Sequence, residues 1–78
     1  MVMKPDDTFD IPSIGDTVAW RWYRHVIKGI VKNVCAEPTH IYTKGKIVTR
    51  NGTLENPAII ISHASGNDVI KLASELYQ

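Results

Sequence analysis

Residues 17–36 read TVAWRWYRHVIKGIVKNVCA, which is two β-prone segments joined by a polar tip. Apolar residues alternate along the first segment, as expected of a strand with one buried face: Val18, Trp20 and Trp22. The second segment has Gly29 near its middle, and an isolated glycine in a strand is typical of a bulge or a bend. This stretch therefore predicts two strands around a loop tip at residues 23–25, with the second strand bending near Gly29.

Short strand candidates separated by turn residues continue to the end of the chain. The candidates are residues 40–42, 46–50, 58–62 and 69–72. Lys44-Gly45, Asn51-Gly52 and residues 65–68 predict turns, and the turn at Asn51-Gly52 is expected to require a positive φ at Gly52. No segment has the length and period of a helix. The pattern predicts an all-β fold of five to six short antiparallel strands, closed into a small barrel because closure removes exposed sheet edges.

The isoleucine run at residues 59–61 lacks the alternation of the other strands. A strand that is apolar on both sides is either covered on both faces by its own chain or meets a second subunit with its outer face. The second possibility predicts a self-assembling structural or stress-related protein that forms a homodimer through this run or through an open strand edge.

The chain has 78 residues, which is enough for one small domain. Residues 1–12 combine aspartates and prolines without an apolar period, which predicts a flexible acidic leader before a barrel domain at residues 13–78. The leader has charges where a signal peptide needs an apolar core, and no apolar run approaches the roughly 20 residues of a membrane span. Cys35 is the single cysteine, as is common in reducing compartments. The expected location is the cytoplasm, without a membrane partner.

Three segments have a recognisable pattern. They are IGDTVAW at residues 14–20, KGKIVTRNGT at residues 44–53 followed by Asn56-Pro57-Ala58, and VIKLASEL at residues 69–76. In their order and spacing these segments resemble the hypervirulence-associated Tudor domain family, over roughly residues 14–77. The resemblance implies an SH3-like (Tudor-type) barrel and assigns no chemistry. The first hairpin tip departs from the family pattern, because Trp22-Tyr23-Arg24-His25 stands where a glycine-bearing turn is common.

Aromatic residues near the first tip point to a partner-binding rim. Trp20 is expected in the core and Tyr23 on the surface, while Trp22 is either core or rim. Rings of this kind also bind desolvated cations, as in methyl-lysine readers. Arg50 either holds its own loop through hydrogen bonds or contacts a partner. The first hypothesis is a non-enzymatic module that binds a protein or peptide through Trp22, Tyr23, Arg24, Tyr42 and Arg50.

Charge is unevenly distributed, although the net charge is only +1. Residues 17–54 hold seven basic side chains and one acidic one, whereas both ends of the chain are acidic. A basic face with interleaved tyrosines is one arrangement that binds nucleic acid. The alternative hypothesis is therefore a nucleic-acid-binding accessory protein that uses Arg21, Arg24, Lys44, Lys46 and Arg50.

Catalytic and metal-binding patterns are missing from the sequence. Cys35 lies in an apolar strand, where a thiol is expected to be inert, and its spacing from His25, His40 and His63 matches no zinc pattern. There is no glycine-rich phosphate loop and no paired-carboxylate spacing. We expect no enzymatic activity, no cofactor and no metal.

Overall fold

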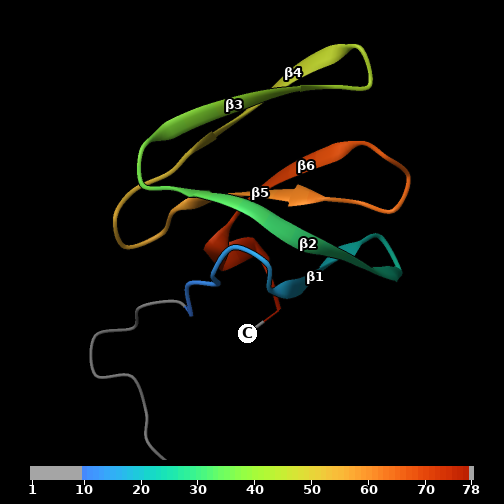
Figure 1. The fold of residues 1–78 in the computed structure, drawn as a ribbon, viewed down its shortest axis with the longest axis horizontal. Helices are drawn as coiled ribbons and strands as arrows, with labels where there is room; N and C mark the ends of the chain where they lie inside the picture. Colours follow the sequence, from blue (N-terminus) through green and yellow to red (C-terminus); the bar gives the residue numbers. More distant parts are fainter. Residues whose placement is uncertain (1–9, 78) are drawn as a thin grey trace, which may run out of the picture.

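The computed structural model describes residues 10–77, which form six antiparallel strands and one 3₁₀ turn (Figure 1). The elements are β1 (Thr17–Trp22), β2 (His25–Cys35), β3 (Pro38–Thr43), β4 (Lys46–Asn51), β5 (Ala58–Ser62), β6 (Asp68–Leu72) and η1 (Ala73–Glu75). The predicted all-β fold is confirmed. Most of the predicted leader, residues 1–9, lies outside the described residues. Within residues 10–77, no helix has the length and apolar character needed to cross a membrane.

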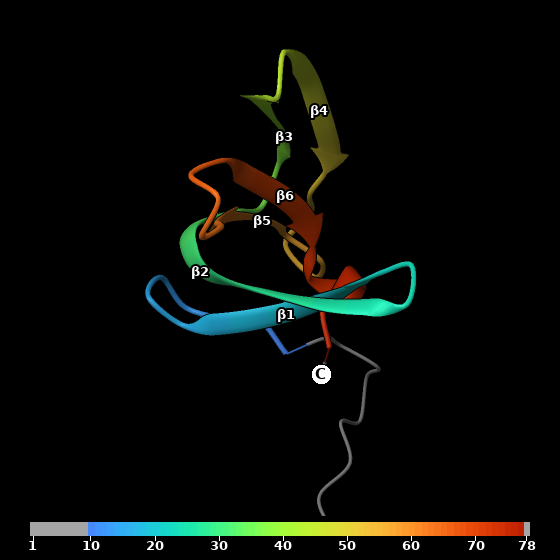
Figure 2. The same cartoon turned by 90° about the vertical axis from the view of Figure 1, so that its right-hand side faces the viewer.

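The strands form a curled sheet and a separate hairpin. The sheet has the order β1-β2-β5-β6, and β3 pairs only with β4 among the named strands. Because β2 continues into β3 and β4 into β5, the β3–β4 hairpin is the bent-over end of one long two-stranded ribbon. Figures 1 and 2 show it lying over β6, on the side away from β1. The result is a partly open barrel rather than a flat sheet.

One face of the four-stranded sheet encloses the main core. Its buried members come from β1, β2, β5 and the C-terminal turn: Trp20, Val31, Ile59, Ile61, Ala73 and Leu76. Ile59 and Ile61 are fully buried, and burying one such side chain contributes about 1.5–3 kcal/mol. The end of the chain closes this core, since Leu76 bridges to Trp20 and the Tyr77 amide donates to the Ala19 carbonyl over 2.9 Å.

The bend predicted at Gly29 lies further along β2. Gly29 pairs in regular register with Val18, and the irregularity falls between Val31 and Asn33. Gly29 has a different role, because a Cβ there would overlap the Ile61 side chain and lie 2.8 Å from the Ser62 carbonyl oxygen. Glycine therefore allows β2 and β5 to approach closely, and the extra residue at Lys32 shifts the apolar pattern from Val31 to Val34.

The isoleucine run is fully covered on its core face and partly covered on its opposite face. Ile59 and Ile61 face the core, while Ile60 is half-buried on the opposite face, where it pairs with Ile70. Ile70 is only 2% exposed, and the β3–β4 hairpin contacts β6 from outside the sheet. The hairpin directs its less exposed side chains, including Ile41 and Val48, toward β6. This chain therefore buries Ile59 and Ile61 fully and Ile60 in part.

Gly52 does not adopt the predicted positive φ. Among the described glycines, positive φ occurs at Gly15, Gly45 and Gly66. A Cβ at Gly52 would instead lie 2.5 Å from the Cys35 carbonyl oxygen and 2.6 Å from the Ala58 amide nitrogen. Gly52 is therefore required because the ribbon folds tightly at this point, and backbone from both strands passes beside it.

A charged contact ties the hairpin to the end of the barrel. Arg50 Nε donates to Glu75 Oε1 over 2.8 Å, and the Leu72 amide donates to the same oxygen over 2.7 Å. Burial would raise the pKa of Glu75, but the hydrogen bonds from Arg50 and Leu72 and the charges of Arg50 and Lys71 outweigh it. The pKa of Glu75 is therefore lowered. This tether joins the base of the hairpin, at the end of β4, to η1.

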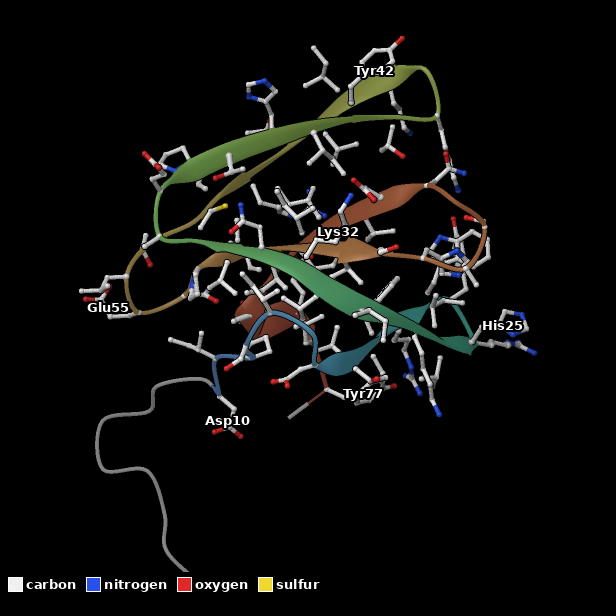
Figure 3. All side chains as sticks on the ribbon, in the orientation of Figure 1. Asp10, His25, Lys32, Tyr42, Glu55 and Tyr77 are labelled. Atoms are coloured by element: carbon white, nitrogen blue, oxygen red, sulfur yellow. The ribbon has the colours of Figure 1, made fainter. Side chains whose placement is uncertain are left out.

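The tether predicts a pH-dependent contribution to stability. A lowered pKa in the folded state adds stability above the ordinary glutamate value of about 4.3, and this is lost as pH falls through the folded pKa. Because the pair is partly solvated, we expect Glu75→Gln to cost about 0.5–1 kcal/mol at neutral pH and little at about pH 3. Urea unfolding at several pH values measures this. The matched control is Glu55→Gln, because Glu55 is an exposed loop residue whose side chain projects outward (Figure 3). An equal loss at both pH values for Glu75→Gln would contradict the assignment.

Candidate functional site

Three hairpin ends meet at one end of the barrel. They are the β1–β2 turn at residues 23–24, the β3–β4 turn at Lys44-Gly45 and the β5–β6 loop at residues 63–67, all at the right of Figure 1. The Lys44-Gly45 turn was predicted, and both of its residues have positive φ, as a tight hairpin requires. Between these ends lies an open groove of about 310 Å³.

The groove has an aromatic floor and one exposed aromatic wall. Trp20, 4% exposed, forms the floor and packs edge-on against His63, with ring centroids 6.5 Å apart. Trp22, on the same face of β1, is 56% exposed and forms the wall. The remaining sides come from all three hairpins: Ile27, Lys44, Ser65, Asn67, Val69 and Lys71. The groove therefore combines apolar surface with two lysines.

Hydrogen bonds in the β5–β6 loop orient His63. The Ser65 amide donates to His63 Nδ1 over 3.1 Å, and Ser65 Oγ lies 2.8 Å from the same nitrogen. Because a backbone N–H can only donate, Nδ1 holds the lone pair, and we infer that the neutral ring carries its proton on Nε2. The loop thus sets the tautomer of a histidine that lines the groove.

Three of the predicted partner-binding residues come together at the β1–β2 tip. Trp22 and Tyr23 form an edge-to-face pair with ring centroids 4.7 Å apart, and Arg24 follows them in the turn. Tyr23 is 79% exposed and has a φ of 55°, a conformation that bulky residues rarely adopt. An exposed aromatic pair on a strained turn is a feature that core packing does not explain.

The other two predicted residues lie elsewhere. Tyr42 projects from the outer face of β3, away from the groove (Figure 3). Arg50 is on the opposite face of the hairpin, where it binds Glu75 and donates to the Thr49 carbonyl oxygen over 3.1 Å. The structure therefore does not bring Tyr42 and Arg50 to the aromatic pair.

The five basic residues of the nucleic-acid hypothesis are spread over different parts of the molecule. Lys44 and Lys46 flank Gly45, and Arg24 is in the β1–β2 turn. Arg21 is on the face of β1 opposite Trp20, beside Glu75 and Tyr77. With Arg50 held by Glu75, these side chains do not line one continuous track.

The sequence pattern did not single out six groove residues: Ile27, His63, Ser65, Asn67, Val69 and Lys71. Their signal was present in part, because Val69 and Lys71 alternate along β6 and pair with Ile61 and Ile59, whose side chains face the core.

Among the described residues, no three His, Cys, Asp or Glu side chains gather as they would around a metal ion. Cys35 is half-buried at the end of β2 opposite the groove.

The curled antiparallel sheet and its open, ring-lined end define a small Tudor-like barrel. Residues 15–76 match the family described as the hypervirulence associated proteins TUDOR domain. Since this match covers most of the chain, the chain belongs to that family, and the resemblance noted in the sequence is confirmed. Tudor-like domains are typically small binding modules without catalytic activity. Comparison with curated proteins and with solved structures found no match.

Proposed function

We propose that this chain is a non-enzymatic binding module that engages a protein or peptide partner at the groove end of the barrel. Trp22, Tyr23 and Arg24 form the contact on one side, and the β5–β6 loop forms the other. The observation that carries the proposal is the exposed Trp22–Tyr23 pair beside an open groove, since exposed tryptophan and tyrosine are characteristic anchors of interfaces. The proposal places the chain in the cytoplasm, where the single Cys35 stays reduced.

The alternatives have less support from the geometry. Nucleic-acid binding would need a basic track, and Arg50 is occupied by Glu75. Self-association through the isoleucine run would need that run exposed, whereas Ile59 and Ile61 are fully buried and Ile60 is half-buried.

Replacing Trp22 by alanine tests the proposal. We expect Trp22→Ala to keep the fold, because the side chain is 56% exposed, and to weaken partner binding by about 30-fold, as loss of an interface tryptophan commonly does. The measurement is quantitative retention of proteins from a nuclease-treated cell extract on the immobilised full chain, with thermal melts to check the fold.

Tyr42→Ala is the matched control, because it removes an exposed ring (74% exposed) outside the groove. Proteins retained by the wild-type chain and by Tyr42→Ala, and lost by Trp22→Ala, support the proposal. Equal retention by all three chains contradicts it. Retention seen only in a parallel assay with untreated extract would favour the nucleic-acid alternative, and recovery of the chain's own second copy would favour self-association.

A further inference from the structure

The groove is positively charged. Lys44 enters it from the β3–β4 turn and Lys71 from β6, and no carboxylate lines it. Within residues 10–77, neither lysine forms an ion pair. The two nearest acidic residues along β6 and η1 are bound to other cations, since Asp68 Oδ2 is 2.9 Å from Lys32 Nζ and Glu75 is held by Arg50. Two ammonium groups therefore face the groove with their charge largely uncompensated, apart from the longer-range field of Lys71 on Glu75.

The remaining lining is apolar or donates hydrogen bonds. Trp22 and Val69 offer apolar surface. His63, with its proton on Nε2, and the side-chain amide of Asn67 can both donate to an acceptor, whereas the Ser65 hydroxyl already donates to His63 Nδ1. A carboxylate is an acceptor only, so it matches this set of donors and cations.

A cationic ligand fits this groove poorly. An aromatic surface attracts an ammonium group when the negative electrostatic potential of the ring faces outweighs that of other nearby charges. Here two fixed positive charges share the same small groove, and like charges in a partly desolvated site repel. The composition of the groove thus disfavours a methylated lysine, even though tryptophans are present.

Resting on the proposed function, we propose that the groove selects an acidic peptide, with carboxylates held between Lys44 and Lys71 and an apolar side chain packed on Trp22. A peptide is favoured over single-stranded nucleic acid because a strand of phosphates needs a track of cations and stacked rings. This groove offers one confined pair of lysines, and Arg21 points from the opposite face of β1.

Binding of three matched octapeptide libraries to the full chain tests this inference. The first library contains Asp, Glu, Leu and Phe, the second replaces the acids by Asn and Gln, and the third replaces them by trimethyl-lysine. We expect the first library to bind. In NMR spectra it should shift the indole resonance of Trp22 and the backbone amide resonances of Trp22, Lys44 and Lys71. Lys44→Gln and Lys71→Gln should each weaken it roughly fivefold, as an exposed ion pair allows. Lys28→Gln, on the other face of β2, is the control and should leave the affinity unchanged.

Each contrary result overturns the inference in a distinguishable way. If the neutral or trimethyl-lysine library binds as tightly, the charge selection is wrong while the groove remains a peptide site. If no library binds but extract proteins are still lost by Trp22→Ala, the acidic-peptide inference fails and the proposed function stands. Tighter binding of an oligo(dT) probe than of the acidic library would assign the groove to nucleic acid instead. If Trp22→Ala changes neither the retention of extract proteins nor the binding of the acidic library, both the proposed function and the acidic-peptide inference fail.

Discussion

Replacing Trp20 by alanine is expected to lower the free energy of unfolding by about 3–5 kcal/mol. The ring is 4% exposed, packs against His63, and shares the core with Ile61 and Leu76. A domain of this size has a total stability on the order of 5–10 kcal/mol, so the substitution removes a large part of it. Urea unfolding followed by circular dichroism measures the loss.

Trp22→Ala is the natural comparison, since it deletes the same side chain two residues away on the same strand face. At 56% exposure Trp22 contributes mainly surface, and we expect a cost below about 1 kcal/mol. Similar losses for the two variants would show that Trp22 belongs to the core, and would remove the structural basis for a binding role.

The second large effect is expected at Gly52. Adding one methyl group there places it 2.5 Å from the Cys35 carbonyl oxygen and 2.8 Å from the Glu37 carbonyl oxygen. Both atoms are backbone, so the strain cannot be relieved by rotating a side chain. We expect Gly52→Ala to cost about 3 kcal/mol or more, because overpacking at a rigid site is strongly destabilising. Thermal and urea unfolding measure it.

Gly66→Ala separates crowding from conformational strain. Gly66 has a φ of 91°, but nothing lies within 4 Å of the position its Cβ would take. Its substitution should cost only about 1–2 kcal/mol, from the left-handed backbone alone. If Gly52→Ala is no worse than Gly66→Ala, the tight fold of the ribbon at Gly52 is not as described.

Much of the fold was predictable from local pattern, because strands and tight turns are encoded by neighbouring residues. The alternation through Val18, Trp20 and Trp22 and the Lys44-Gly45 turn are examples. The predicted roles of Gly29 and Gly52 were both wrong, and for the same physical reason. Glycine is required either by a special backbone angle or by close approach of another chain segment, and the second depends on residues far away in the sequence. At Gly29 that residue is Ile61.

The candidate site divides in the same way. Trp22, Tyr23 and Arg24 were predictable together because they are consecutive in one turn. Tyr42 and Arg50 were grouped with them on residue type alone, but the register of the hairpin places them on opposite faces. Lys71 and His63 join the groove only because β5 pairs with β2, a long-range pairing that the local pattern does not reveal.

The walls of the groove are drawn from nearly the whole length of the domain. Trp20 lies on the first strand and Lys71 on the last, with Lys44 carried by the hairpin between them. No nascent chain or proteolytic fragment that lacks either end holds a complete groove. The proposed recognition at this site therefore requires a fully folded domain, so a partner that binds there would distinguish the native state from unfolded or truncated chains.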